Sequence, residues 1–298
     1  MIAYLYLALA LFAGLAKGFI GKKTSGDMES FRDCTFINLL RMLFCALVGF
    51  IFVIADGAFS ALALTPESFG IYTLSAVSVS AFCVCWMYAY KADAYVFLNI
   101  FTMLGSIITS LLGFFIYSEP ITLGKWIGMG LLVVAVSIMS KYNKDIKGKI
   151  SLKGIIILVV GCLGCSIGDF SQKVYMKTSG ESSAVFNFYT YIIAFVLLLI
   201  LYAALAMRKK TPKLTLAVAS KRNVLLYFLM SACLFLNAFF KTLAAGTLSS
   251  AEIYPVLQGA NLILSGVMAQ LFFGEKMNRK SLAGILTALA AVIIMSVL

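Results

Sequence analysis

The chain has no histidine, and acidic residues account for only 12 of its 298 positions. Histidine is the side chain that proteins most often use as a general base and as a metal ligand. The sequence also lacks a phosphate-binding GxxxxGKS/T segment and a paired Asp-x-x-Asp motif. These absences argue against a membrane-embedded enzyme and against a nucleotide-driven pump, and no cofactor or metal ion is expected.

Long polar stretches are missing too, because 62% of the residues are hydrophobic and only 12% are charged. Soluble domains carry about 25% charged residues, so the apolar surface of this chain must face lipid. Apolar runs of about 20 residues, the length that spans a bilayer, occur at residues 2–20, 33–55, 70–90, 94–117, 122–140, 153–174, 184–207, 223–243, 249–273 and 280–297. The sequence therefore predicts an all-α protein of the cell membrane with ten transmembrane helices.

One motif occurs twice. Ser118-Glu119 follows an apolar run, and Gly128 lies nine residues after the glutamate; Gly274-Glu275 and Gly284 repeat this pattern 156 positions later. A GxxxG motif, which lets helix backbones approach closely, occurs at residues 14–18 and again at 164–168. We therefore expect five-helix repeats at residues 1–140 and 153–298, joined by a basic linker at 141–152. Copies with an odd number of spans insert in opposite orientations, as in many secondary transporters.

These paired motifs make the chain resemble the drug/metabolite transporter superfamily, specifically its ten-helix EamA-like branch. The resemblance covers the whole chain and also includes residues 90–94 (YKADA), residues 241–245 (KTLAA) and Arg41. Ser118 stands where the family more usually has glycine. The resemblance implies transport of amino acids, amines, nucleosides or related compounds.

The loop charges predict an orientation. Loops that follow odd-numbered helices hold most of the Lys and Arg residues, whereas loops after even-numbered helices hold only Lys125, Lys173, Lys177 and Lys241. Cytoplasmic loops carry the Lys and Arg excess, so this pattern places both termini outside. Family members usually have both termini inside. The net charge of +12 is thus attributed to orientation and to anionic headgroups, and no nucleic-acid partner is expected.

Two acids within predicted helices are the first candidates for the substrate site. Carboxylates have short stems, and ionisable residues inside membrane helices suggest function. Two readings are open for Asp169 and Glu252: each is half of an ion pair, with Lys173 or Lys241 as partner, or each faces a water-filled cavity. In the second reading an acid binds a cationic substrate or exchanges a proton.

Further candidates surround these acids in the sequence. Pro255 predicts a kink or break in its helix, and Asn99 is its counterpart in the first repeat. The amides of Asn99 and Gln258 are expected to contact substrate. Tyr254 and Trp86 are either a cage for an ammonium group or, for Trp86, part of the interfacial aromatic belt. Lys17 either contacts substrate or, like Arg41, extends to the headgroups.

The motif residues Glu119, Gly128, Glu275 and Gly284 are assigned structural roles, with each glutamate capping the helix that follows it. The predicted function is secondary transport of a small metabolite by alternating access, with a slight preference for a cationic or zwitterionic solute such as an amino acid or amine. A lipid or lipid-linked headgroup flippase, or an accessory subunit of one, is the alternative. The expected partners are the solute, the lipid bilayer and a proton as coupling ion, and the chain is a monomer or a homodimer.

Overall fold

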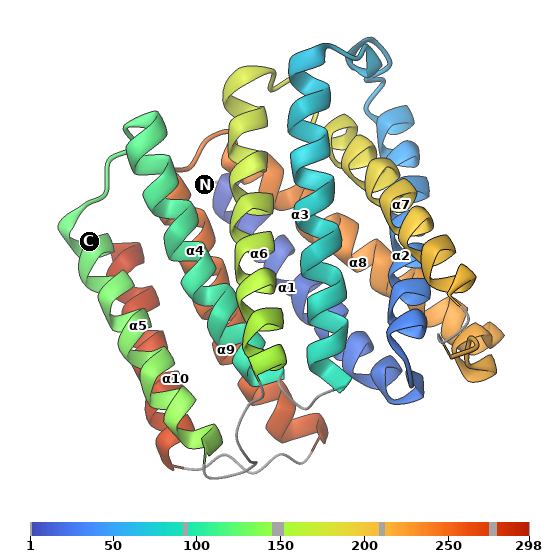
Figure 1. The fold of residues 1–298 in the computed structure, drawn as a ribbon. Coiled ribbons are helices and arrows are strands. Elements are labelled where there is room, and N and C mark those ends of the chain that lie inside the picture. The colour runs from blue at the N-terminus through green and yellow to red at the C-terminus, as the bar shows by residue number, and fades with distance from the viewer. Residues whose placement is uncertain (1, 92–94, 145–151, 209–211, 274–278, 298) are drawn as a thin grey trace.

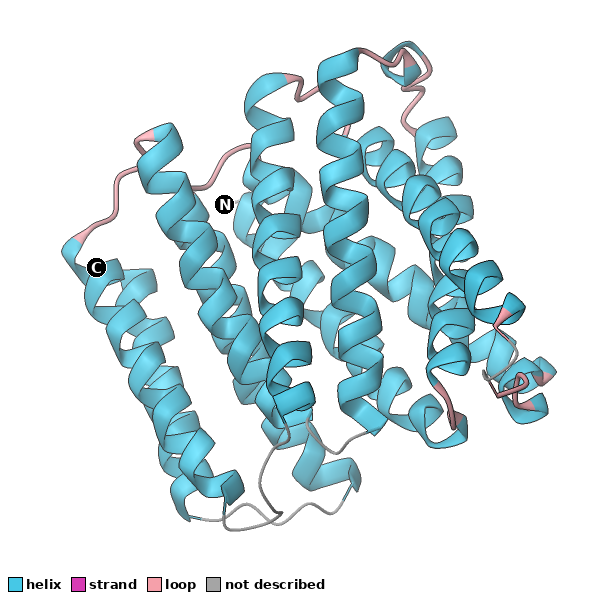
Figure 2. Ribbon diagram, viewed as in Figure 1, coloured by secondary structure: helices cyan, strands magenta, loops and turns pink. Residues whose placement is uncertain are grey.

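A computed structural model describes residues 2–91, 95–144, 152–208, 212–273 and 279–297. These residues form helices joined by short loops, and none of them lies in a strand (Figure 2). The α-helices are α1 (Ile2–Thr24), α2 (Phe31–Ala55), α3 (Pro66–Lys91), α4 (Tyr95–Tyr117), α5 (Leu123–Lys144), α6 (Leu152–Thr178), α7 (Ser183–Met207), α8 (Lys221–Ala245), α9 (Ser250–Phe273) and α10 (Arg279–Val297). Each predicted apolar run therefore lies mainly within one of these helices.

The outer surface is suited to lipid. Within the described residues, α1, α2, α3, α6, α7, α8 and α9 are long and apolar enough to cross a membrane, whereas the apolar segments of α4, α5 and α10 are shorter. Large apolar side chains are exposed on the outside, among them Phe12, Phe115, Ile200 and Leu271. Exposed apolar surface on this scale would be unfavourable in water. The chain is thus a multi-pass membrane protein.

Serine caps fix where several helices begin. Ser30 precedes α2, and its hydroxyl accepts from the Asp33 amide while the Asp33 carboxylate accepts from the Ser30 amide. This reciprocal capping box satisfies two backbone donors that the helix itself leaves free. The hydroxyls of Ser182 and Ser220 cap α7 and α8 in the simpler way. Local sequence therefore sets these boundaries.

The main contacts between helices have equivalents in which each helix is replaced by its counterpart from the other repeat. Helix α2 packs on its counterpart α7, and α5 packs on α10, while the pair α1–α8 corresponds to the pair α6–α3. In Figure 1, α1 descends from the end marked N and α6 rises from the opposite end. We call the end that holds both chain termini the terminal end, and the other the linker end. The opposite directions of α1 and α6 are those expected of inverted repeats.

Two of the apolar clusters in the core lie on opposite sides of the molecule. One joins α2, α3, α7 and α8 around residues such as Met42 and Phe235. The other joins α4, α5, α9 and α10 around residues such as Leu132 and Ala288. Figure 1 shows α1 and α6 between these two groups. Each group combines helices of both repeats, so the two halves are in contact throughout the molecule, with α1 and α6 in its middle.

Of the kink or break expected at Pro255, the break is not formed, and the kink stays a prediction. Helix α9 runs through the buried Pro255 from Ser250 to Phe273. A proline inside a helix lacks the amide that would bond the carbonyl four residues earlier, which here belongs to Ala251. The first turn of α9 also has a hydrogen-bond partner outside the helix, because the Glu119 carboxylate accepts from the Ser250 amide at 2.7 Å.

Candidate substrate cavity

A cavity of about 120 Å³ lies between the two halves. Since one water molecule needs roughly 10–15 Å³ on this scale, the space corresponds to about ten waters, or a solute of about ten non-hydrogen atoms. Its walls come from α1, α3, α4, α6, α7, α8 and α9. Its polar and glycine lining residues are Gly14, Lys17, Gly18, Lys22, Cys83, Trp86, Thr102, Gly164, Cys165, Gly168, Asp169, Gln172, Tyr191, Asn237, Lys241, Gln258, Asn261 and Ser265.

The two GxxxG motifs bring the cavity walls together. A Cβ placed on Gly164 would lie 2.9 Å from the Ser78 carbonyl oxygen of α3, and one on Gly14 would lie 3.1 Å from Nδ2 of Asn237 in α8. At Gly164 the neighbour is a backbone atom, so only glycine allows this approach, whereas at Gly14 a Cβ would require the Asn237 side chain to shift by a few tenths of an ångström. The repeated motif thus makes the two equivalent contacts, α6 with α3 and α1 with α8.

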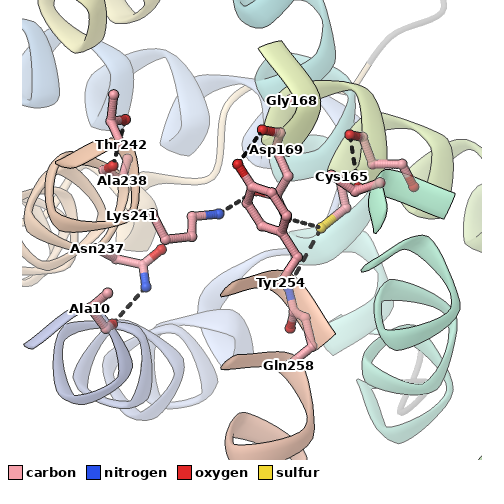
Figure 3. Close-up of polar contacts among 12 residues, drawn as sticks. Ala10, Cys165, Gly168, Asp169, Asn237, Ala238, Lys241, Thr242, Tyr254 and Gln258 are labelled. Carbon is pink, nitrogen blue, oxygen red and sulfur yellow. Dashed lines mark hydrogen bonds and ion pairs between the residues drawn. The ribbon is translucent and has the colours of Figure 1, made fainter. Parts of the chain in front are cut away.

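An ion pair lies at the terminal end of the cavity. Figure 3 shows Lys241 extending from α8 toward Asp169 of α6, with Tyr254 of α9 beside them. Lys241 Nζ and the Asp169 carboxylate form an ion pair, and both residues are buried. The Tyr254 hydroxyl donates to the Asp169 carbonyl at 2.7 Å, and its ring centroid is 5.9 Å from Lys241 Nζ. The Asp169 carboxylate therefore lines the cavity with its charge already balanced.

Glu119 caps a helix of the opposite half, which corrects the expectation that it caps the helix following it. Its carboxylate accepts from the amide of Ser250 at the start of α9 and pairs with Lys173 of α6 at 2.7 Å. The Lys173 ammonium also donates to the carbonyls of Ala245 and Leu248, at 3.0 and 2.6 Å. One buried charge pair thus joins the α4–α5 loop, α6 and the α8–α9 turn.

The pKa of Glu119 responds to this environment. Burial alone raises the pKa of the carboxyl group, but the hydrogen bonds from Lys173 and from the Ser250 amide outweigh burial and hold the pKa below its ordinary value. Glu119 is therefore charged at neutral pH.

A third ion pair lies at the same end. Lys125 Nζ of α5 is 3.0 Å from the carboxylate of Glu252 in α9. Glu252 also accepts from the Ser249 amide, is partly exposed, and is not among the described residues that line the cavity. We call the pairs Asp169–Lys241, Glu119–Lys173 and Glu252–Lys125 the ion-pair layer. Three of the four lysines of the charge-poor face, Lys125, Lys173 and Lys241, thus serve as internal partners of acids.

Basic and aromatic side chains characterise the middle of the cavity. Lys17 Nζ lies 5.2 Å from the ring centroid of Trp86 and 5.9 Å from that of Phe82. Trp86 is buried, whereas Trp126 is exposed, so Trp86 is not part of an interfacial belt. Arg41 is fully buried and does not extend to the headgroups; its guanidinium donates to the Asn38 side-chain oxygen at 2.7 Å. The guanidinium carbon of Arg41 lies 5.5 Å from the Trp86 ring centroid, so two cations, Lys17 and Arg41, lie beside this ring.

Exposure of the lining changes along the cavity. Gln172 and Lys241, next to the ion-pair layer, are buried, whereas Lys22 and Met268, toward the linker end, are partly exposed. The cavity is therefore closed off at the terminal end and more accessible at the linker end.

The structure brings together four of the seven predicted substrate residues, because Lys17, Trp86, Asp169 and Gln258 all line the cavity. Tyr254 is fully buried directly behind Asp169. The side chain of Asn99 and the whole of Glu275 lie outside the described residues. Of the motif glycines, Gly128 packs against Met295 of α10, and Gly284 is buried.

Sequence reasoning missed two amides. Asn237 and Asn261 line the cavity from α8 and α9. Each is a polar residue near the middle of a predicted span, and polar residues in that position usually face the interior of a helix bundle. That signal was sufficient to identify them. Among the described residues, no three Cys, Asp or Glu side chains gather closely enough to hold a metal ion.

Comparison with known proteins agrees with this architecture. A solved structure titled only "Crystal structure of protein" superposes with a TM-score of 0.73 at 10% identity, covering 98% of this chain and 95% of that one. At this identity the likeness concerns the fold alone. No curated protein matches the chain by sequence. The family profile described as "EamA-like transporter family" matches residues 1–141 and again residues 152–297, and the chain therefore belongs to the EamA-like transporter family.

Proposed function

We propose that the chain is a secondary transporter that carries a small solute across the membrane by alternating access. The observation that carries this proposal is the cavity between the halves, closed off at the terminal end by the ion-pair layer and more accessible at the linker end. A single site between inverted repeats, reached from one side at a time, is the arrangement that alternating access requires.

The ion-pair layer contains the contacts that must break when the cavity opens toward the terminal end. Glu119 and Lys125 belong to the first repeat, and their partners Lys173 and Glu252 belong to the second. Two of the three pairs therefore hold the halves together at the terminal end. Opening of the cavity toward that end separates these pairs, and the glycine-mediated crossings of α1 with α8 and α6 with α3 allow the halves to rock.

The linker end also carries the basic loops. If cytoplasmic loops hold the Lys and Arg excess, the cavity is accessible from the cytoplasm in this conformation and both termini lie outside. We propose this orientation, together with a proton as the coupling ion. A proton gradient should then drive accumulation of solute in liposomes, and dissipation of the gradient should abolish accumulation but not exchange.

Solute exchange tests the function directly. A thermal-shift screen of the purified protein against a metabolite library identifies ligands, and each ligand is then tested for counterflow in liposomes. Leu257→Trp places bulk inside the cavity and should abolish counterflow. The matched control Leu286→Trp changes a lipid-exposed side chain of α10 and should retain it.

Two results would overturn the proposal. One is counterflow that persists in Leu257→Trp at the rate of the control. The other is translocation of fluorescent lipid headgroups without exchange of any soluble ligand, which would support the flippase alternative.

A further inference from the structure

We infer that the cavity recognises an anionic group on its solute, a carboxylate or a phosphate, and that Lys17 is the residue that binds it. The inference rests on the proposed function, since it concerns the same cavity. The sequence suggested a slight preference for a cationic or zwitterionic solute; this inference instead requires an anionic group, which a zwitterion carries and an amine does not.

The charged lining of the cavity is predominantly basic. Among the described lining residues, the charged ones are Lys17, Lys22, Lys241 and Asp169. The aspartate is engaged by Lys241 in a buried ion pair, and Glu252 lies outside the lining and pairs with Lys125. A cationic solute would therefore have to displace a lysine to reach a carboxylate.

Lys17 differs from these acids because no described side chain of opposite charge pairs with it. It lies in α1 between the two glycines of the first GxxxG motif, with its ammonium beside the rings of Trp86 and Phe82. No carboxylate of the described residues is within ion-pair distance of Lys17. Aromatic faces attract a cation, but they do not neutralise it. An ionisable group held within a membrane helix in this way is by default a functional one.

Arg41 adds a second positive charge behind Trp86. The guanidinium is fully buried, lies 5.5 Å from the Trp86 ring centroid, and has an Nε without a hydrogen-bond partner in the described part of the chain. Its described hydrogen bond is with the neutral side chain of Asn38. Buried charges without counter-charges are costly, and a cleft with apolar walls concentrates their field. An anion in the cavity would offset both.

Neutral donors lie close to Lys17. The Nδ2 of Asn261 is 3.6 Å from the position a Cβ would take on Gly14, about one turn of α1 from Lys17. Gln258 lies one turn earlier on α9 and also lines the cavity. Amide donors next to an ammonium are well suited to the several acceptor lone pairs of a carboxylate or phosphate. With the cavity volume, this describes a small organic acid, an amino acid or a phosphate ester.

Tryptophan fluorescence tests the charge of the cavity without knowledge of the natural solute. The chain has two tryptophans, so Trp126→Phe leaves Trp86 as the only reporter, beside Lys17. Quenching by iodide and by caesium is measured on the full chain at constant ionic strength. We expect iodide to quench Trp86 about tenfold more strongly than caesium, because a cationic cleft enriches anions by at least that factor.

Matched variants assign the effect to Lys17. Lys17→Gln should remove most of the preference for iodide, and Lys17→Arg should restore it. Lys221→Gln, which removes an exposed lysine at the start of α8, should leave the preference unchanged. Caesium quenching equal to iodide quenching, or an iodide preference unaffected by Lys17→Gln, would overturn the inference.

Competition then separates carboxylates from phosphates. Succinate and glycerol 3-phosphate are added as probes, with putrescine as the cationic control. Protection of Trp86 from iodide by either anion, lost in Lys17→Gln, supports the inference and names the group. Protection by putrescine alone, or by no probe, contradicts it. Counterflow of a cation at a rate unchanged by Lys17→Gln refutes this inference but not the transport function. Anion binding without counterflow refutes the transport function but not the anion site.

Discussion

Two glutamate side chains that accept hydrogen bonds at the start of α9 offer a sharp test of how burial changes the stability contributed by an ion pair. Glu119 accepts from the Ser250 amide and Glu252 from the Ser249 amide, and each pairs with a lysine of another helix. They differ in burial: the Glu119 side chain is 9% exposed and that of Lys173 is 3% exposed, whereas the Glu252 side chain is 30% exposed. The same substitution, glutamate to glutamine, therefore isolates the effect of burial.

Glu119→Gln should be clearly destabilising. Removal of one charge from a buried ion pair costs about 3–5 kcal/mol. We expect at least the lower end, about 3 kcal/mol, because Lys173 and the Ser250 amide donate to different carboxylate oxygens, and the single oxygen of glutamine can accept from only one of them. For a chain of this size that is a fall in melting temperature of roughly 6–12 °C. Glu252→Gln should cost about 1 kcal/mol or less, since partly exposed pairs contribute little.

The assay is thermal unfolding of the purified variants in one detergent, followed by cysteine accessibility or light scattering. Lys173→Met and the double variant Glu119→Gln with Lys173→Met complete a double-mutant cycle. The two single losses should not add, because the double variant leaves no uncompensated buried charge. Equal melting temperatures for Glu119→Gln and Glu252→Gln, or full additivity in the cycle, would refute the reasoning.

Three further predictions concern pH, packing and orientation. The pKa of Glu119 is lowered in the folded protein, so its contribution to stability is complete above its ordinary pKa of 4.5 and is lost as the pH falls through the folded pKa. Below about pH 4.5 the melting temperature of Glu119→Gln should therefore decrease less steeply with falling pH than that of the wild type. Equal slopes of melting temperature against pH would contradict this. Gly164→Val places a side chain against the Ser78 carbonyl and should cost about 1–3 kcal/mol, whereas Gly130→Ala, with open space around its Cβ, should be neutral or stabilising; the check is the melting temperature of both. A phosphatase fused at the carboxy terminus should be active if the charge-based orientation holds, whereas a fluorescent cytoplasmic reporter there would overturn it.

The repeat and the fold class followed from sequence because their signals are local. Apolar runs, the spacing of Glu119 and Gly128, and the two GxxxG motifs are patterns within about 20 residues, and each acts on its own helix or its neighbour. The placement of Asp169, Lys17, Trp86 and Gln258 around one cavity follows in part from the same rule, since polar groups in a membrane helix turn toward the interior of the bundle.

The partners of the charges were decided only by tertiary structure. Lys125 meets Glu252 across 127 positions of sequence, and Glu119 caps a helix that begins 131 positions away instead of the helix that follows it. Sequence reasoning listed the acids and lysines but had no distances between helices, and an ion pair forms only where two side chains come within about 4 Å. Because those distances also leave Lys17 and Arg41 without a described carboxylate, the packing of the helices, and not composition, sets the sign of the charge that the cavity offers to a solute.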